Sequence, residues 1–183
     1  MIARLSEPLT AALLIALACL ITLGFALTMQ FVFNHPPCEL CLWQRVPYIV
    51  AEGLAMASAI LSILANGKKT SETGRKRKYC IVGQLLKLCA ITFLIGMVLA
   101  IYHSGIERHL WQSATSCSLP PLTSHGNPAD LRDLLLARPV VRCDEIGWSI
   151  AGLTMANINI PFSLALAAFA WRAAAGPRNK SRT

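Results

Sequence analysis

The feature that most constrains this chain is an apolar run over residues 9–33 that contains no charged side chain. At 1.5 Å per residue, a helix of about 25 residues is roughly 37 Å long and crosses the ~30 Å hydrocarbon core of a bilayer with some tilt. Three further apolar runs cover residues 46–65, 80–103 and 148–171. Because a lipid-exposed backbone must satisfy its own hydrogen bonds, these runs predict an all-α, four-helix transmembrane bundle, with residues 1–183 as a single domain.

The composition agrees with a membrane protein. Hydrophobic residues make up 55% of the chain and charged residues 14%, whereas a soluble domain carries about 25% charged residues. This balance excludes a disordered chain, a small disulfide-stapled domain and an ordinary cytosolic enzyme. A cleaved signal peptide has an apolar core of about 7–15 residues, so we expect the longer first run to be retained as a span.

The distribution of lysine and arginine predicts the orientation of the bundle. Eleven of these residues lie in the two terminal segments and in the connector between the second and third spans, whereas five lie in the two opposite connectors. The positive-inside rule then places both termini in the cytoplasm and the loops at about residues 34–45 and 104–147 in the periplasm. We attribute the net charge of +8 to contact with anionic membrane lipid. No nucleic-acid partner is expected, because no recognition motif accompanies the charge.

This topology divides the seven cysteines into two groups. Three fall within predicted spans, where cysteine usually behaves as a small hydrophobic residue: Cys19, Cys80 and Cys89. The other four fall in the outer loops, with one pair in each loop: Cys38, Cys41, Cys117 and Cys143. An even number of cysteines on an oxidising face predicts two disulfides.

The first pair forms a Cys-Glu-Leu-Cys motif at residues 38–41, directly after two prolines. Two residues between cysteines allow a tight, reactive bridge, and a helix that starts there lowers the pKa of a thiol at its N-terminus. If that helix includes Cys41, Arg45 shares its face one turn later. A guanidinium in that position can stabilise a thiolate or donate to an acceptor oxygen on a ligand.

Other chemistries for this motif are less well supported. A c-type haem site needs histidine directly after the second cysteine, where the chain has Leu42. A four-cysteine zinc site normally combines two closely spaced couples, but about 25 residues separate Cys117 from Cys143. We therefore expect no metal, and we keep an inert structural disulfide as an alternative.

Three other features remain open at this point. In the long loop, residues 129–137 have the apolar spacing of a short amphipathic helix, which either guides the loop cysteines toward the first pair or merely covers the bundle. Glu52 and Lys87 lie inside predicted spans. Snorkelling toward the lipid surface explains Lys87, whereas Glu52 is a candidate for a role in the bundle interior.

The residues around the cysteines resemble those of the DsbB family, the bacterial disulfide bond formation protein B. Residues 38–48, CELCLWQRVPY, are similar to the family signature C-x-x-C-x-x-Q-R-x-P-Y. Residues 102–107 and 116–118 resemble the end of the family's third span and its long loop, and residues 142–159 resemble the approach to its fourth span. The resemblance covers the whole chain.

The resemblance implies a quinone-linked thiol oxidoreductase of the bacterial inner membrane that re-oxidises a periplasmic thioredoxin-like oxidase, DsbA. In that scheme the partner's thiolate attacks Cys117, and the released Cys143 attacks Cys38. Cys41 then passes electrons to ubiquinone or menaquinone, with Arg45 orienting the quinone ring.

Three further residues are expected on the quinone side: Gln44, His103 and Glu107. Some family members have a histidine just beyond the third span, and either His103 or Glu107 takes that position here.

Two other functions remain as alternatives. One is a four-span scaffold that has only structural disulfides and no enzymatic activity. The other is a reductase of the vitamin K epoxide type, in which the Cys-x-x-Cys motif lies on the last span. Here the motif precedes the second span, which counts against that type.

Overall fold

The computed structural model describes residues 7–67, 71–111, 143–144, 149–150 and 152–175. Within these residues the chain forms four long helices: α1 (Glu7–Phe31), α3 (Arg45–Ala65), α4 (Glu72–Glu107) and α6 (Met155–Ala174). A short helix, α2 (Glu39–Trp43), precedes α3, and a hairpin of β1 (Ser149–Ile150) and β2 (Leu153–Thr154) precedes α6. The predicted helical architecture is thus confirmed, whereas Cys117 and the predicted loop helix at 129–137 lie outside the described residues.

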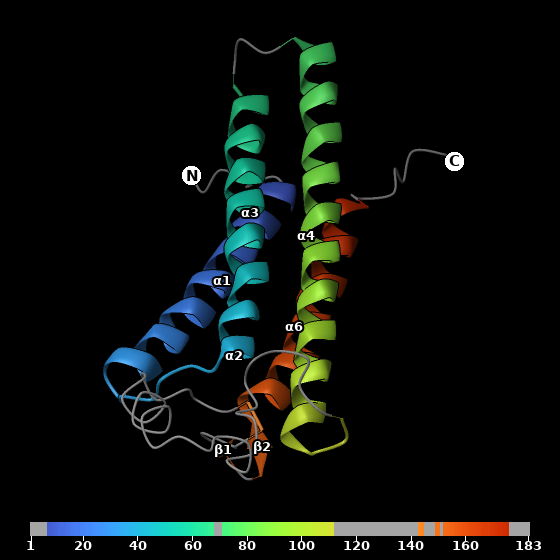
Figure 1. Ribbon diagram of the computed structural model, residues 1–183. Coiled ribbons are helices and arrows are strands. Elements are labelled where there is room, and N and C mark those ends of the chain that lie inside the picture. The colour runs from blue at the N-terminus through green and yellow to red at the C-terminus, as the bar shows by residue number, and fades with distance from the viewer. Residues whose placement is uncertain (1–6, 68–70, 112–142, 145–148, 151, 176–183) are drawn as a thin grey trace, which may run out of the picture.

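Helix α4 is central to the packing, because it lies against both α3 and α6, and α3 also packs against α1 (Figure 1). Small residues allow two of these contacts to be close. A Cβ atom at Gly96 would lie 3.3 Å from the Pro47 side chain of α3, and one at Gly83 would lie 3.3 Å from the Ala174 carbonyl oxygen of α6. Gly53 has no neighbour within 4 Å. Gly83 and Gly96 therefore allow α4 to lie close to α6 and α3, whereas Gly53 of α3 has no such role.

Three of the helical segments are long and apolar enough to cross a membrane: Pro8–Phe31, Glu39–Ala65 and Glu72–Glu107. Their outward faces carry large exposed hydrophobic side chains, including Leu17, Ile21, Ile63 and Val98. Lipid is the solvent that suits such a surface, because exposed apolar patches this large are rare on soluble monomers. Helix α6 completes the bundle and carries Asn157, Asn159 and Ser163 in its first half.

The fourth helix begins later than the predicted start at residue 148. The chain first forms the β1–β2 hairpin, in which Gly152 adopts a left-handed φ of +79°. Thr154 then caps α6, because its Oγ1 accepts a hydrogen bond from the Asn157 N–H. This turn and cap start the helix at Met155, so apolar residues before it are not helical.

Helix α4 extends beyond the predicted span of residues 80–103 at both ends. Ser71 caps its N-terminus by accepting a hydrogen bond from the Gly74 N–H, and the helix continues to Glu107. Residues 104–107 are therefore helical rather than part of the outer loop. As a consequence, His103 and Glu107 lie one turn apart on the same face.

The boundary between α2 and α3 lies at Gln44 and has its physical cause in Pro47. Proline lacks the N–H that would donate to the carbonyl four residues earlier, and its ring crowds that carbonyl. In this chain the affected carbonyl belongs to Trp43, the last residue of α2. The break separates α2, which holds the first cysteine pair, from the long helix α3.

Beyond α4, the chain folds back against the helix end. The Trp111 indole N–H donates to the Tyr102 carbonyl oxygen at 3.0 Å, and the two rings stack with centroids 6.3 Å apart. Gly105 lies beneath the indole, where a Cβ atom would come within 2.0 Å of the ring. Only glycine leaves room for this contact.

We therefore expect Gly105→Ala to destabilise the protein by about 1–3 kcal/mol, because the Trp111 ring must move away from α4. The matched control is Gly53→Ala, which adds the same methyl group to a helix where nothing lies within 4 Å. Thermal unfolding in detergent should show a lower midpoint for the Gly105 variant alone. Equal midpoints for the two variants would contradict the assigned packing.

Candidate functional site

Helix α2 holds the Cys-x-x-Cys motif. Cys38 is the N-cap of the helix, and its Sγ accepts a hydrogen bond from the Cys41 N–H at 3.2 Å. The two sulfur atoms are 2.7 Å apart and are not covalently joined. A disulfide bond of about 2.05 Å is thus within a small movement of the side chains, and the motif can alternate between dithiol and disulfide.

The two cysteines are not equivalent. Cys38 is buried, whereas Cys41 is partly exposed. The hydrogen bond that the Cys38 thiol donates to the Cys41 sulfur, together with burial, raises the pKa of Cys38 above its usual range. The shared proton therefore stays on Cys38, and Cys41 is the sulfur that ionises first.

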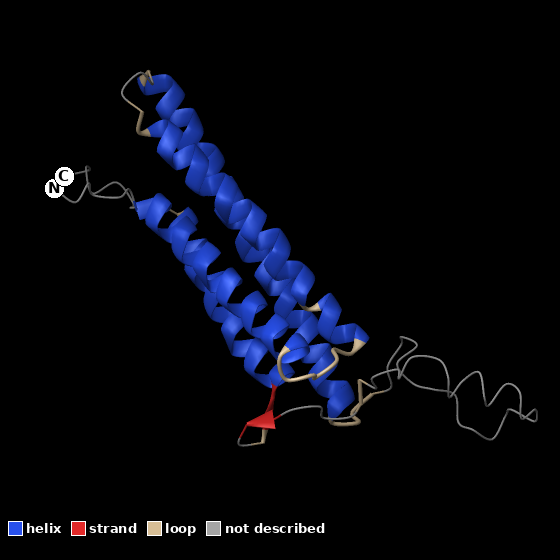
Figure 2. Ribbon diagram, turned by 90° about the vertical axis from the view of Figure 1, so that its left-hand side faces the viewer, coloured by secondary structure: helices blue, strands red, loops and turns tan. Residues whose placement is uncertain are grey.

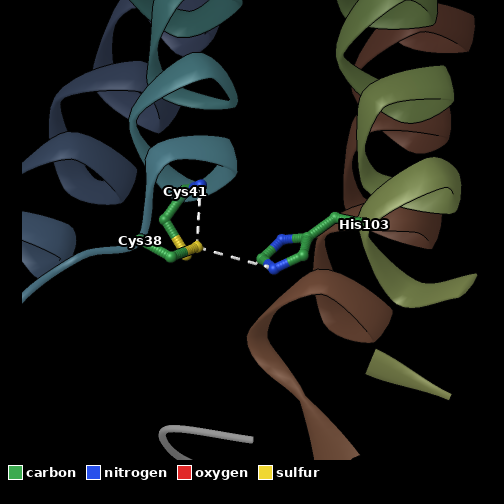
Figure 3. A group of neighbouring side chains, drawn as sticks. All are labelled: Cys38, Cys41 and His103. Atoms are coloured by element: carbon green, nitrogen blue, oxygen red, sulfur yellow. Dashed lines mark hydrogen bonds between the residues drawn. The ribbon is translucent and has the colours of Figure 1, made fainter. Parts of the chain in front are cut away.

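His103 reaches the motif from α4 (Figure 3). Its Nε2 lies 3.6 Å from the Cys38 Sγ, and its Nδ1 lies 2.7 Å from the Gln44 Nε2. The Gln44 carbonyl oxygen accepts from the Asn159 Nδ2 at 2.8 Å, which leaves its NH₂ group to donate to His103. This network assigns the ring proton to Nε2, so His103 presents an N–H to the Cys38 sulfur.

Glu107 lies beside the histidine on the next turn of α4. Its Oε1 is 3.7 Å from the His103 Nε2, and its Oε2 accepts a hydrogen bond from the Thr154 hydroxyl of β2. Both side chains of the pair are largely buried. The contact with Thr154 ties the end of α4 to the start of α6, and so it fixes one wall of the site.

A second polar group continues from Gln44 into the bundle. The Tyr48 hydroxyl donates to the Asn159 Oδ1 and lies 3.0 Å from the Ser163 Oγ. Ser163 also donates to Asn159. Sequence reasoning did not assign Asn159 to the site, although an asparagine four residues before a serine in an apolar helix is a signal of a buried polar network.

Cys143 joins the site from a distant part of the chain. It is 1% exposed and packs in one apolar cluster with Cys38, Leu40 and Ile106. Of the four cysteines predicted to react, three therefore come together at one end of the bundle. Figure 1 shows α2, the yellow end of α4 and the hairpin at that end, and Figure 2 shows the red strands of the hairpin at one end of the helices.

Arg45 points to a neighbouring helix rather than to the histidine. Its Nη1 donates to the Gln30 Oε1 at 2.7 Å, and its Nη2 donates to the Ala26 carbonyl oxygen at 3.5 Å. These contacts hold the end of α1 beside the start of α3. The guanidinium also lies close enough to favour the Cys41 thiolate electrostatically.

The two ionisable residues inside the spans lie away from this site. One carboxylate oxygen of Glu52, Oε2, is buried and has no hydrogen-bond partner within the described part of the chain. Lys87 lies on α4 among apolar residues. Neither side chain has a contact that connects it to the cysteines of α2.

The chain is similar over nearly its whole length to one protein family, because the model of disulfide bond formation protein DsbB matches residues 8–173. Disulfide bond formation protein B of Nitrosospira multiformis is 30% identical over 82% of this chain and 81% of its own length. The protein of that name from Herminiimonas arsenicoxydans is 32% identical over 66% of this chain and 65% of its own.

An uncharacterized protein of Rickettsia prowazekii is 24% identical over 82% of this chain and 78% of its own length. No solved structure matches the chain. The family match and these relatives confirm the resemblance seen in the cysteine motifs: the chain belongs to the DsbB family of membrane disulfide bond formation proteins.

Proposed function

We propose that this chain re-oxidises a periplasmic thioredoxin-like dithiol oxidase of the DsbA type and passes the electrons to a membrane quinone. The observation that carries the proposal is that Cys143 and Cys38 are members of one buried cluster. Thiol–disulfide exchange requires one sulfur to attack another directly, and these two cysteines come from segments about 100 residues apart. Two inert structural disulfides would not need Cys143 of the long loop to pack in the cluster that holds Cys38.

The partner's thiolate attacks Cys117 of a Cys117–Cys143 disulfide, and Cys143 leaves as a thiolate. Cys143 attacks Cys38 of the Cys38–Cys41 disulfide, and Cys41 leaves as a thiolate. The partner's second thiolate then releases Cys117 and forms the partner's disulfide.

Cys117 in turn attacks Cys143, which restores the loop disulfide and frees Cys38. The Cys38–Cys41 dithiol now holds two electrons and two protons. The quinone accepts both as the Cys38–Cys41 disulfide re-forms.

The residues beside Cys41 suit a quinone. Leu42, Trp43 and Val46 present large apolar side chains to the exterior, where a lipid-soluble ring can approach. Arg45 has five N–H donors, and Gln30 and Ala26 take two of them within the described residues. Arg45 is therefore the proposed donor to a quinone carbonyl, whereas Gln44 and His103 act on the cysteine side of the site.

The proposed topology is that of the sequence prediction: four spans, both termini in the cytoplasm of a bacterial cell, and the cysteines on the periplasmic face of the inner membrane. The supporting observation is that the cysteine site lies at the opposite end of α4 from the basic residues that follow Glu72. Positive residues mark the cytoplasmic side.

Quinone absorbance in detergent tests the function. The purified chain, mixed with a reduced thioredoxin-like periplasmic oxidase, is expected to consume one equivalent of ubiquinone or menaquinone for each partner disulfide formed. Omitting the partner is expected to stop quinone loss. No quinone loss with either quinone, from a folded chain, would favour the scaffold with structural disulfides.

A further inference from the structure

We propose that the reduced site is also a binding site for a thiolate-preferring divalent metal ion, with Zn²⁺ as the expected ion and Cys38, Cys41 and His103 as its ligands. The ligand atoms of these three residues all lie within 4.8 Å of one another. Figure 3 shows the two sulfur atoms and the imidazole ring facing each other across the gap between α2 and α4. This inference does not rest on the quinone chemistry proposed above.

The distances fit a tetrahedral zinc ion. With Zn–S of about 2.3 Å and Zn–N of about 2.05 Å, a sulfur and a nitrogen ligand lie about 3.6 Å apart in a tetrahedron. The Cys38 Sγ and the His103 Nε2 are 3.6 Å apart. The two sulfurs must separate from 2.7 Å to about 3.8 Å. The side chain of Cys41 is only partly buried, so it has room for this movement.

The charges also fit. A zinc ion with two thiolates and a neutral imidazole has no net charge, which suits a buried site where an uncompensated ion is costly. A set of two cysteines and one histidine leaves the fourth position open for water. The Glu107 carboxylate, 3.7 Å from the His103 Nε2, offers a further oxygen ligand beside this position.

The second ring nitrogen of His103 already has a polar neighbour. Metal-binding histidines normally have their other ring nitrogen held by a polar partner, and Gln44 lies 2.7 Å from the His103 Nδ1. On metal binding the ring proton moves to Nδ1, and the Gln44 amide turns so that its oxygen accepts that proton. Asn159, which bonds to Gln44, can turn with it. The two thiols release their protons, so two protons leave for each ion bound.

Metal and disulfide exclude each other at this site, because both use the same two sulfur atoms. The reduced chain should therefore bind the ion and the oxidised chain should not. A bound ion withdraws both sulfurs from thiol–disulfide exchange. The same residues thus form a redox centre that available zinc can hold in its reduced, inactive state.

Cobalt titration of the full chain in detergent tests the site. After anaerobic reduction with a phosphine, Co²⁺ is added as a spectroscopic stand-in for Zn²⁺. The expected result is one equivalent bound, with a sulfur-to-cobalt charge-transfer band and the visible bands of a tetrahedral ion, both abolished by one equivalent of Zn²⁺. The oxidised chain is expected to show neither band.

Variants then locate the ion. Cys38→Ser and His103→Ala are each expected to weaken Co²⁺ binding by at least about 100-fold, since even the loss of a group that hydrogen-bonds to a metal ligand costs about 10–100-fold. The matched control is Cys80→Ser, which removes an exposed thiol at the other end of α4 and should leave binding unchanged. Absence of a one-equivalent thiolate band, or an unchanged band in both site variants, overturns the site.

A measurement on the unaltered chain covers the case in which a variant loses its fold. Zn²⁺ should protect Cys38 and Cys41 from alkylation, while Cys80 reacts at the same rate with or without the ion. If Zn²⁺ leaves the alkylation rates of all three cysteines unchanged, the proposal is overturned. Quinone reduction is measured without metal. A chain that fails to reduce quinone can therefore still be tested for binding of Zn²⁺ or Co²⁺, and the two results are independent.

Discussion

Replacing Cys41 with serine is expected to reduce quinone turnover by at least about 10⁴-fold, the scale of loss that follows removal of a covalent nucleophile. Cys41 is the sulfur of the motif that ionises first, because the shared proton and the raised pKa belong to Cys38. Serine keeps the volume of the side chain but forms no disulfide and gives up no electrons. The measurement is quinone absorbance with a reduced thioredoxin-like oxidase as the donor.

Two further variants make this result specific. Cys80→Ser, at the opposite end of α4, should retain turnover, since its exposed thiol has no role in the exchange. Cys143→Ser should lose steady turnover with the protein donor. A sample of that variant reduced beforehand by a small reagent should still reduce one equivalent of quinone, because Cys38 and Cys41 remain. Normal turnover by the Cys41 variant would refute the proposed electron path.

Much of the helical architecture can be predicted from the sequence, because membrane spans depend on long apolar runs that are visible without tertiary contacts. The start of the fourth helix cannot be predicted in this way. Apolar residues precede Met155, but the left-handed Gly152 and the Thr154 cap make them a hairpin. Hydropathy does not distinguish a strand from the first turns of a helix when both are apolar.

The cysteine motif could also be predicted from the sequence, since spacing alone brings Cys38 and Cys41 together on one turn. The position of His103 against Cys38 could not. It requires α4 to pack beside α2 and α3, so that two residues 65 positions apart in the chain meet. Gln44 and Asn159 come together for the same reason, through packing of α6 on α4. Such contacts between helices carry no local sequence signal.

His103→Ala is expected to lower turnover at pH 7 by about 10–100-fold, the scale of a lost hydrogen bond to a charged group. Re-forming the Cys38–Cys41 disulfide requires Cys38 to lose a proton from a thiol with a raised pKa. The His103 N–H lies 3.6 Å from that sulfur and favours its thiolate. Without it, Cys38 ionises at higher pH.

Below its pKa, the thiolate fraction of Cys38 rises about tenfold per pH unit, so the variant should regain activity as the pH rises. The wild type should reach its plateau at a lower pH. His103→Gln, which keeps an N–H donor, should recover part of the loss, while His35→Ala, in an exposed loop, should match the wild type.

These readouts distinguish stabilisation of the Cys38 thiolate by His103 from a purely structural role. A histidine that only packs against α2 would lower activity equally at every pH, and glutamine would rescue it no better than alanine. The assigned tautomer also predicts an effect of Gln44→Leu. This substitution removes the donor to the His103 Nδ1, so the ring is free to present an unprotonated Nε2 to Cys38. That variant should therefore show the same alkaline shift as His103→Ala, although its histidine is intact.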